Sequence, residues 1–188
     1  TLGIITELTV RLYGIPERIL AAVVPFATLV GAAETTMQAI QLGLGLARIE
    51  LLDPLQIRAV NLHNKLALAE TPTLFVELNG SGNGVAEQME AFREIAESCG
   101  ALGFEMAEAE DYRRRLWKAR HDAYFATRAA WPGKRTLATD VCVPISRLAE
   151  CIAETEEDIR RLRLICPIVG HVGDGNFHAT PVIDPDDP

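Results

Sequence analysis

The sequence lacks both a long apolar run and an excess of basic charge. A membrane-spanning helix needs about 18 or more consecutive apolar residues, and no uninterrupted apolar stretch of this chain reaches that length. The 188 residues carry 26 acidic and 18 basic side chains, which gives a formal net charge of −8. A general nucleic-acid binder neutralises phosphates with a basic surface. We therefore expect neither a membrane span nor a nucleic-acid partner.

Cysteine is scarce and is spaced for neither zinc fingers nor redox pairs. There is no C-x-x-C, and no cysteine lies near a histidine at zinc-finger spacing. This usage is typical of reduced thiols in a cytosolic or matrix-type compartment. The first residues also lack the basic n-region of a signal peptide. The four cysteines are Cys99, Cys142, Cys151 and Cys166.

Apolar periodicity divides residues 20–106 into strands that alternate with helices. Strands are expected at 20–26, 47–51, 72–78 and 101–106, and helices at 28–42, 53–68 and 85–98. This order is similar to a split βαβ, ferredoxin-like layer with one extra helix. The predicted fold class is therefore α+β, an antiparallel sheet with its helices on one face.

The second half of the chain continues this alternation. A helix at 108–130 precedes a strand at 136–143, a helix at 144–161, and two strands at 165–172 and 177–183. A second ferredoxin-like unit is thus expected to begin at Thr136. We expect it to be cut before it closes, because the last residues have the composition of a turn.

His171 and His178 flank a strong turn signal in the sequence. Asp174-Gly175 between two apolar runs is typical of a hairpin. A turn at these two residues, or a four-residue loop at 173–176, would pair His171 with His178. Opposed residues project from one face with Cβ atoms about 5 Å apart. Two imidazoles so placed can hold zinc, iron or manganese. The alternative is a pair of half-exposed sheet histidines.

Two ligands do not complete a metal site, which needs a third protein donor. Asp174 is the nearest carboxylate, although an Asp before Gly commonly serves the turn itself. Asn176 is either a turn residue that tolerates positive φ or an amide directed at a ligand. The residues alone leave both alternatives open.

Arg120 lies on one face of the helix expected at 108–130, together with Trp117 and Tyr124. A guanidinium held between two aromatic rings is a preorganised fork for a carboxylate. The alternative is an arginine whose stem packs on the rings while its head reaches solvent. Arg120 is therefore a candidate anion-binding residue.

Residues 171–178 read His-Val-Gly-Asp-Gly-Asn-Phe-His and resemble the H-x-G-D-G-N-x-H motif of FAD-linked 2-hydroxyacid dehydrogenases. These belong to the flavoprotein superfamily that includes vanillyl-alcohol oxidase. Residues 47–53, 72–77, 116–121 and 139–148 are similar to the cytochrome-linked D-lactate dehydrogenase branch, which is related to the glycolate oxidase FAD subunits. The resemblance covers essentially the whole chain and implies an FAD-linked oxidase C-terminal domain.

The resemblance also implies which part of a longer protein this chain represents. Residues 1–16 would be the tail of the FAD-binding domain and a linker. Residues 17–188 would be the substrate-binding cap domain, incomplete at its C-terminus. In that family a later Glu-His-Gly motif supplies the third metal ligand and the candidate base. Neither is in this chain, so no catalytic residue is assigned, and the isolated chain is expected to be inactive.

The residue roles carried over from the family are as follows. His171 and His178 would be metal ligands, Arg120 would bind the substrate carboxylate, and Asn176 would lie beside the substrate. In relatives that act on 2-hydroxyglutarate, a Thr and a Lys contact the second carboxylate. Here Tyr124 and Ala138 stand at or near those positions, which favours a monocarboxylate such as lactate. Backbone and side chains of the segment Gly3, Ile4 and Ile5 would lie against the flavin.

The implied activity is oxidation of D-lactate to pyruvate, with hydride transfer to FAD and a divalent metal (zinc, manganese or iron) on the 2-hydroxyl. The implied electron acceptor is a cytochrome or a quinone, and a homodimer is expected. The expected compartment is the bacterial cytoplasm, peripheral to the inner membrane, or the mitochondrial matrix. D-2-hydroxyglutarate and glycolate are alternative substrates. A metal-dependent hydrolase and a non-catalytic ferredoxin-like metal-binding module are alternatives of other classes.

Overall fold

A computed structural model describes residues 3–12 and 14–186. Its main feature is a seven-stranded sheet in the order β4-β1-β3-β2-β7-β8-β6, and a small second sheet pairs β5 with β9. The pairings between adjacent strands β1–β3, β1–β4, β2–β3, β2–β7, β7–β8 and β6–β8 are antiparallel. The strands are β1 (Arg18–Pro25), β2 (Leu46–Leu52), β3 (Thr73–Gly80), β4 (Glu105–Met106), β5 (Arg135–Thr136), β6 (Val141–Cys142), β7 (Ile168–Gly170), β8 (Asn176–Ala179) and β9 (Val182–Ile183).

The first four strands confirm the predicted ferredoxin-like arrangement. Their order β4-β1-β3-β2 places each strand antiparallel to its neighbours. Helix α1 links β1 to β2 and helix α3 links β3 to β4, while α2 is the extra helix between β2 and β3. The helices are α1 (Leu29–Gln41), α2 (Pro54–Asn64), α3 (Gly82–Ser98), α4 (Glu110–His121), α5 (Ala123–Ala130) and α6 (Leu148–Arg161).

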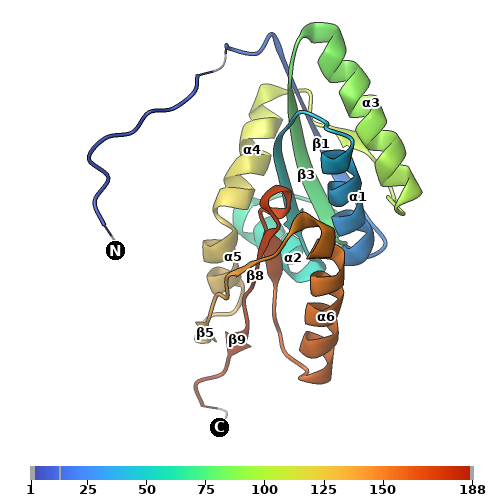
Figure 1. Cartoon of the computed structure of the whole chain (residues 1–188). Helices are drawn as coiled ribbons and strands as arrows, with labels where there is room; N and C mark the ends of the chain where they lie inside the picture. Colours follow the sequence, from blue (N-terminus) through green and yellow to red (C-terminus); the bar gives the residue numbers. More distant parts are fainter. Residues whose placement is uncertain (1–2, 13, 187–188) are drawn as a thin grey trace.

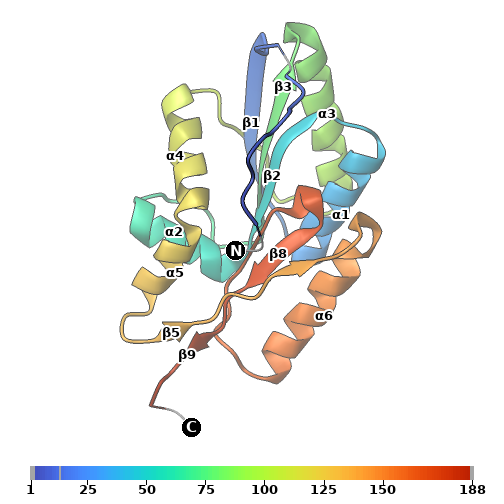
Figure 2. The same ribbon diagram turned by 60° about the vertical axis from the view of Figure 1, so that its left-hand side comes forward.

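The helices cover both faces of the sheet, so the prediction of helices on one face is wrong. Figures 1 and 2 show α1, α3 and α6 on one side of the sheet and α2, α4 and α5 on the other. Strand β1 explains why. Leu20, Ala22 and Val24 enter the cluster with α1, α3 and α6, whereas Ala21 and Val23 enter the cluster with α2, α4 and α5. A strand that is apolar at every position is buried on both faces.

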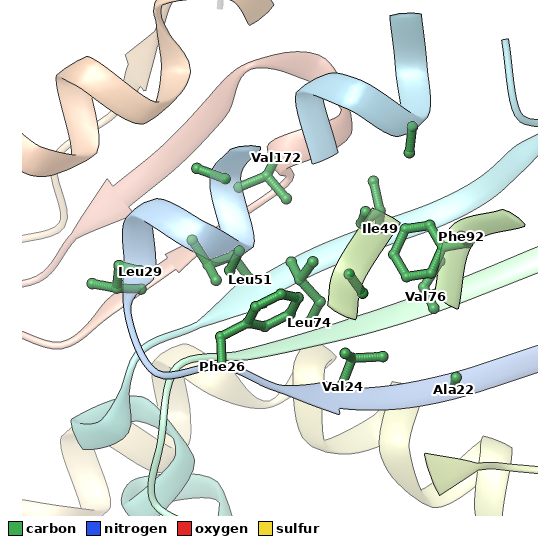
Figure 3. Packing of buried hydrophobic residues seen from close by; sticks show 14 of the residues in the cluster. Ala22, Val24, Phe26, Leu29, Ile49, Leu51, Leu74, Val76, Phe92 and Val172 are labelled. Carbon is green, nitrogen blue, oxygen red and sulfur yellow. The ribbon is translucent and has the colours of Figure 1, made fainter. Parts of the chain in front are cut away.

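Figure 3 shows the larger of these clusters. Phe26, Leu51, Leu74 and Phe92 are fully buried there. Val172, which directly follows His171, also points into this cluster and is fully buried. Burial of an aliphatic side chain stabilises the fold by about 1.5–3 kcal/mol. Val172 therefore anchors the histidine-bearing loop to the core.

The predicted helix at 108–130 is two helices. Helix α4 ends at His121 and α5 begins at Ala123, with Asp122 between them. The Asp122 carboxylate pairs with Lys118 and accepts a 2.9 Å hydrogen bond from the Asn64 amide of α2. This contact ties the junction to α2. Arg120 and Tyr124 therefore lie on different helices.

The predicted hairpin exists, but its register differs from the expected one. His178 pairs with Val169, not with His171, and the backbone N–H of Asn176 donates to the carbonyl of His171. A 3₁₀ turn at Val172–Asp174 forms the loop. The observed register thus differs from the expected one by two residues, and the buried Val172 holds the loop against the core. Because this pairing keeps His171 and His178 on one face as diagonal neighbours, the two imidazoles still face one another.

The expected strand at 136–143 is also divided. Strand β5 ends at Thr136 and pairs with β9, whereas β6 pairs with β8. Between them, the backbone N–H of Thr139 donates to the carbonyl of Ala179 at 2.9 Å. This connection brings Ala138 beside the end of β8.

The segment before β1 carries no helix or strand in its described residues, 3–12 and 14–16. Ile4 and Ile5 are 87% and 82% exposed. Figure 1 shows the segment extending away from the body of the fold. The predicted boundary after residue 16 lies at the end of this segment. No helix within residues 3–12 and 14–186 is long and apolar enough to cross a bilayer.

Asp53 caps helix α2 from a buried position. Its carboxylate accepts a 2.7 Å hydrogen bond from the backbone N–H of Gln56. Burial nevertheless raises the pKa of the carboxyl from 3.8 to about 7. Between these two pH values the unfolded chain ionises this group while the folded chain keeps it protonated. The stability of the fold is therefore expected to fall as the pH rises from about 4 to about 7.

Asp53→Asn should remove most of this pH dependence, because asparagine also caps helices but does not ionise. The variant should exceed the parent in stability by up to about 4 kcal/mol at pH 8 and match it closely near pH 4. Urea unfolding at a series of pH values measures the difference. Asp158→Asn, an exposed change on α6, is the control and should not alter the slope. If the free energy of unfolding fell equally with rising pH in Asp53→Asn and Asp158→Asn, the role of Asp53 would be refuted.

Candidate functional site

A cavity of about 270 Å³ brings together five of the residues singled out by the sequence. It lies beside the junction of α4 and α5 and the hairpin of β7 and β8. Arg120, Tyr124, His171 and His178 line it, and so does Ala138. The remaining lining residues are Gln56, His121, Ala123, Val169 and Thr180.

Arg120 is held at the cavity by Glu50 of strand β2. The guanidinium Nε donates to Glu50 Oε2 at 2.8 Å, and the side chains of the two residues are only 13% and 12% exposed. Arginine has one N–H at Nε and four more on its terminal nitrogens. The bond to Glu50 uses only the first. One terminal nitrogen lies 3.4 Å from His171 Nε2, and the remaining terminal N–H groups are not used by Glu50.

The contacts of His171 determine its tautomer. Its Nδ1 lies 2.7 Å from Glu50 Oε1, and its Nε2 lies 3.4 Å from a terminal nitrogen of Arg120. A carboxylate can only accept and a guanidinium can only donate. Nδ1 therefore carries the proton, and Nε2 presents its lone pair to the cavity.

The contacts of His178 indicate the same tautomer. Its Nδ1 lies 2.9 Å from the carbonyl oxygen of Thr139, which can only accept, so Nδ1 carries the proton here too. The rings of His171 and His178 have centroids 6.3 Å apart and stand nearly perpendicular. In the neutral form of each ring, the proton is therefore on Nδ1 and Nε2 carries the free lone pair.

This donor set fits part of a metal site. Metal-bound imidazoles characteristically donate their other N–H to a carboxylate or a backbone carbonyl, as His171 and His178 do here. A cation at His171 Nε2 would displace the Arg120 contact, because one lone pair serves one partner. Within residues 3–12 and 14–186, no group of three or more Asp, Glu, His or Cys side chains could hold a metal ion. These residues therefore offer two ligands.

Asn176 lies apart from the cavity lining. Its amide nitrogen donates to Asp140 Oδ1 at 2.8 Å and to the carbonyl of Val141 at 2.9 Å. Both amide hydrogens therefore tie β8 to the β6 segment. Only the side-chain oxygen is left to accept a bond from a ligand. Asp174, the other turn residue considered for a site, lies in the 3₁₀ turn and does not line this cavity.

The aromatic residues expected around Arg120 have other contacts. The cation that lies over the Trp117 ring is Arg48, 5.0 Å from the ring centroid. Trp117 also donates its indole N–H to Glu77 at 2.7 Å. Tyr124 is 43% exposed, and its hydroxyl lies 3.5 Å from Thr136 Oγ1. Arg120 is thus oriented chiefly by a carboxylate rather than by ring faces.

Sequence reasoning missed two residues of this site, Glu50 and Gln56. Gln56 donates to the carbonyl of Ala123 and accepts from Thr127, both at 3.0 Å, and so joins α2 to α5. Glu50 stands between Ile49 and Leu51 in an apolar strand. A charged side chain in such a strand needs a partner, and that signal could have drawn attention to it.

The structural comparison agrees with this architecture. The chain aligns with alkyldihydroxyacetonephosphate synthase at a TM-score of 0.62 and 10% identity, over 94% of this chain and 38% of that one. Residues 15–188 match the family model described as FAD linked oxidases, C-terminal domain. The chain belongs to this family. As a member of it, this FAD-linked oxidase domain is part of an oxidoreductase family that uses FAD.

Relatives of this FAD-linked oxidase domain carry more specific names. It is 50% identical to the probable D-lactate dehydrogenase, mitochondrial, of Danio rerio, over all of this chain and 38% of that protein. It is 40% identical to the D-lactate dehydrogenase [cytochrome], mitochondrial, of Arabidopsis thaliana, over 98% of this chain and 33% of that protein. It is 27% identical to the glycolate oxidase subunit GlcD of Bacillus subtilis, over 98% of this chain and 39% of that protein. The chain thus spans between a third and two fifths of the length of these relatives.

Proposed function

We propose that this FAD-linked oxidase domain is the substrate-binding part of an FAD-dependent D-2-hydroxyacid dehydrogenase that oxidises D-lactate to pyruvate. One observation carries the proposal: a small cavity is lined by Arg120, His171 and His178, and a terminal nitrogen of Arg120 lies 3.4 Å from Nε2 of His171. The names of the Danio and Arabidopsis relatives support the choice of substrate.

In the proposed mechanism the terminal nitrogens of Arg120 bind the substrate carboxylate and orient C2. His171 and His178 would hold a divalent cation such as zinc, manganese or iron through Nε2. The cation would supply Lewis-acid chemistry at the 2-hydroxyl, and FAD would accept the hydride. The segment Gly3, Ile4 and Ile5 would contact the flavin.

Two further lining residues of the cavity support a monocarboxylate. Tyr124 and Ala138 line it without adding a cation. A second carboxylate placed there would lose solvation without gaining a charged partner. Asn176 would approach the substrate only through its side-chain oxygen, because its amide hydrogens bind Asp140 and Val141.

The proposal extends to domain organisation, partners and compartment. Residues 1–16 would belong with the FAD-binding domain and 17–188 with the cap domain. The electron acceptor would be a cytochrome or a quinone, and the protein would form a homodimer. Of the two expected compartments, the names of the Danio and Arabidopsis relatives favour the mitochondrion.

Anaerobic reduction of the flavin in the full-length protein tests this function. The FAD and metal content is measured first, and D-lactate, L-lactate, glycolate and D-2-hydroxyglutarate are then added separately. We expect rapid bleaching of the flavin by D-lactate and little by the others. Bleaching by D-2-hydroxyglutarate or glycolate alone would overturn the proposed substrate. Protein that holds FAD and metal but is bleached by none of these acids would refute the dehydrogenase and favour a hydrolase or a binding module.

A further inference from the structure

Glu50 is a nearly buried carboxylate in the interior of the sheet. Strand β2, which carries it, lies between β3 and β7. Its neighbours Ile49 and Leu51 are 4% and 0% exposed, and the Glu50 side chain is 12% exposed. A carboxylate in such a place is costly unless both of its oxygens are satisfied. The partners that satisfy them therefore reveal its role.

The two oxygens of Glu50 bind the two halves of the candidate site. Oε2 accepts from Nε of Arg120 at 2.8 Å, and Oε1 accepts from Nδ1 of His171 at 2.7 Å. Arg120 lies on α4, whereas His171 follows β7. One side chain thus sets the orientation of residues from two elements that are distant in the sequence.

We propose that Glu50 is a positioning residue that couples the anion-binding arginine to the metal-binding histidine. This inference rests on the proposed function. By accepting from Nδ1, Glu50 selects the tautomer of the neutral His171 ring in which Nε2 carries the lone pair. By accepting from Nε, it directs the terminal nitrogens of Arg120 into the same cavity. A neutral amide cannot do both, because its nitrogen donates where both partners also donate.

Glu77 provides a matched comparison on the same face of the sheet. Its side chain is 11% exposed, it accepts from the Trp117 indole at 2.7 Å, and it lies 3.6 Å from Arg48. It stands beside Arg48 in the pairing of β2 with β3. Like Glu50, it fixes α4 to the sheet. It differs in making no contact with a residue of the cavity in the described part of the chain.

The test compares Glu50→Gln and Glu77→Gln in the full-length protein. Both variants should lose stability to a similar extent. Only Glu50→Gln should lower the affinity for zinc(II), by about 10–100-fold, which is the usual effect of removing the hydrogen-bond partner of a metal-bound imidazole. Zinc affinity is measured by competition with a chromophoric chelator. Only Glu50→Gln should also lower kcat/KM for D-lactate, by about 100-fold.

Glu50→Asp provides a further readout. It keeps the charge but shortens the side chain, so it should restore part of the zinc affinity that Glu50→Gln loses. Equal zinc affinities in the two glutamine variants, or no zinc binding by the parent protein, would overturn the proposal. A parent whose flavin is not reduced by D-lactate would refute the proposed function instead, while the zinc measurements would still decide the role of Glu50 toward His171.

Discussion

Arg120→Ala in the full-length protein is expected to lower kcat/KM for D-lactate by about 10²–10³-fold, with a higher KM and a lower kcat. The guanidinium is the cation that lines the cavity together with His171 and His178. Truncation removes a forked, charge-assisted pair of donors from the substrate carboxylate. Among residues 3–12 and 14–186, it also leaves His171 as the one hydrogen-bond partner of the Glu50 carboxylate.

Steady-state kinetics with D-lactate measure this effect, and the FAD content and melting temperature of each variant are compared in parallel. Arg128→Ala, an exposed change on helix α5, is the matched control and should keep the parental kcat/KM. Arg120→Lys should recover only part of the loss, because lysine keeps the charge but cannot form the planar fork. An unchanged kcat/KM in Arg120→Ala would remove Arg120 from the carboxylate site.

Gly175→Ala should lower the free energy of unfolding by about 3 kcal/mol, because two costs add. Gly175 has a φ of +73°, the left-handed region that disfavours residues with a Cβ. A Cβ there would also lie 2.1 Å from the carbonyl oxygen of Val143. The backbone N–H of Val143 donates to the carbonyl of Gly175, so the added methyl group would separate two bonded segments.

Urea unfolding measures this loss, and Gly43→Ala separates its two causes. Gly43 has a φ of +72° but no atom within 4 Å of an added Cβ. Its replacement should therefore cost only about 1 kcal/mol, the conformational part. Equal losses in the two variants would show that the contact with Val143 adds nothing. No loss in Gly175→Ala would contradict the conformation of the hairpin loop.

The first half of the fold could be predicted because local pattern and tertiary packing agree there. Helix α1 carries its apolar residues at helical spacing, and Thr28 caps it by accepting from the N–H of Gly31. The prediction that all helices cover one face of the sheet is wrong, and β1 shows why. Each residue from Leu20 to Val24 is apolar and buried, so periodicity could not separate one face from the other.

The hairpin shows where local signals stop being sufficient. Asp174-Gly175 correctly indicated a turn, yet burial of Val172 beneath α1 set the register. The spacing along the chain likewise could not reveal Glu50. Its partners Arg120 and His171 lie 70 and 121 residues away. A pattern of short period carries no information on contacts at such separations. The family resemblance identified Arg120, His171 and His178 as site residues, whereas their orientation in the cavity depends on tertiary packing.

The junction at Asp122 places Arg120 and Tyr124 on separate helices, whereas one continuous helix would have fixed them relative to each other. Arg120, on α4, is fastened to the sheet through Glu50. Tyr124, on α5, and Ala138, on the connection after β5, also line this cavity. Substitutions at Tyr124 and Ala138 can therefore change the shape of the cavity without disturbing the ion pair of Arg120 with Glu50. Under the proposed function, substitutions at Tyr124 and Ala138 would alter substrate preference, while Arg120 would keep its contact with Glu50 and its role toward the carboxylate.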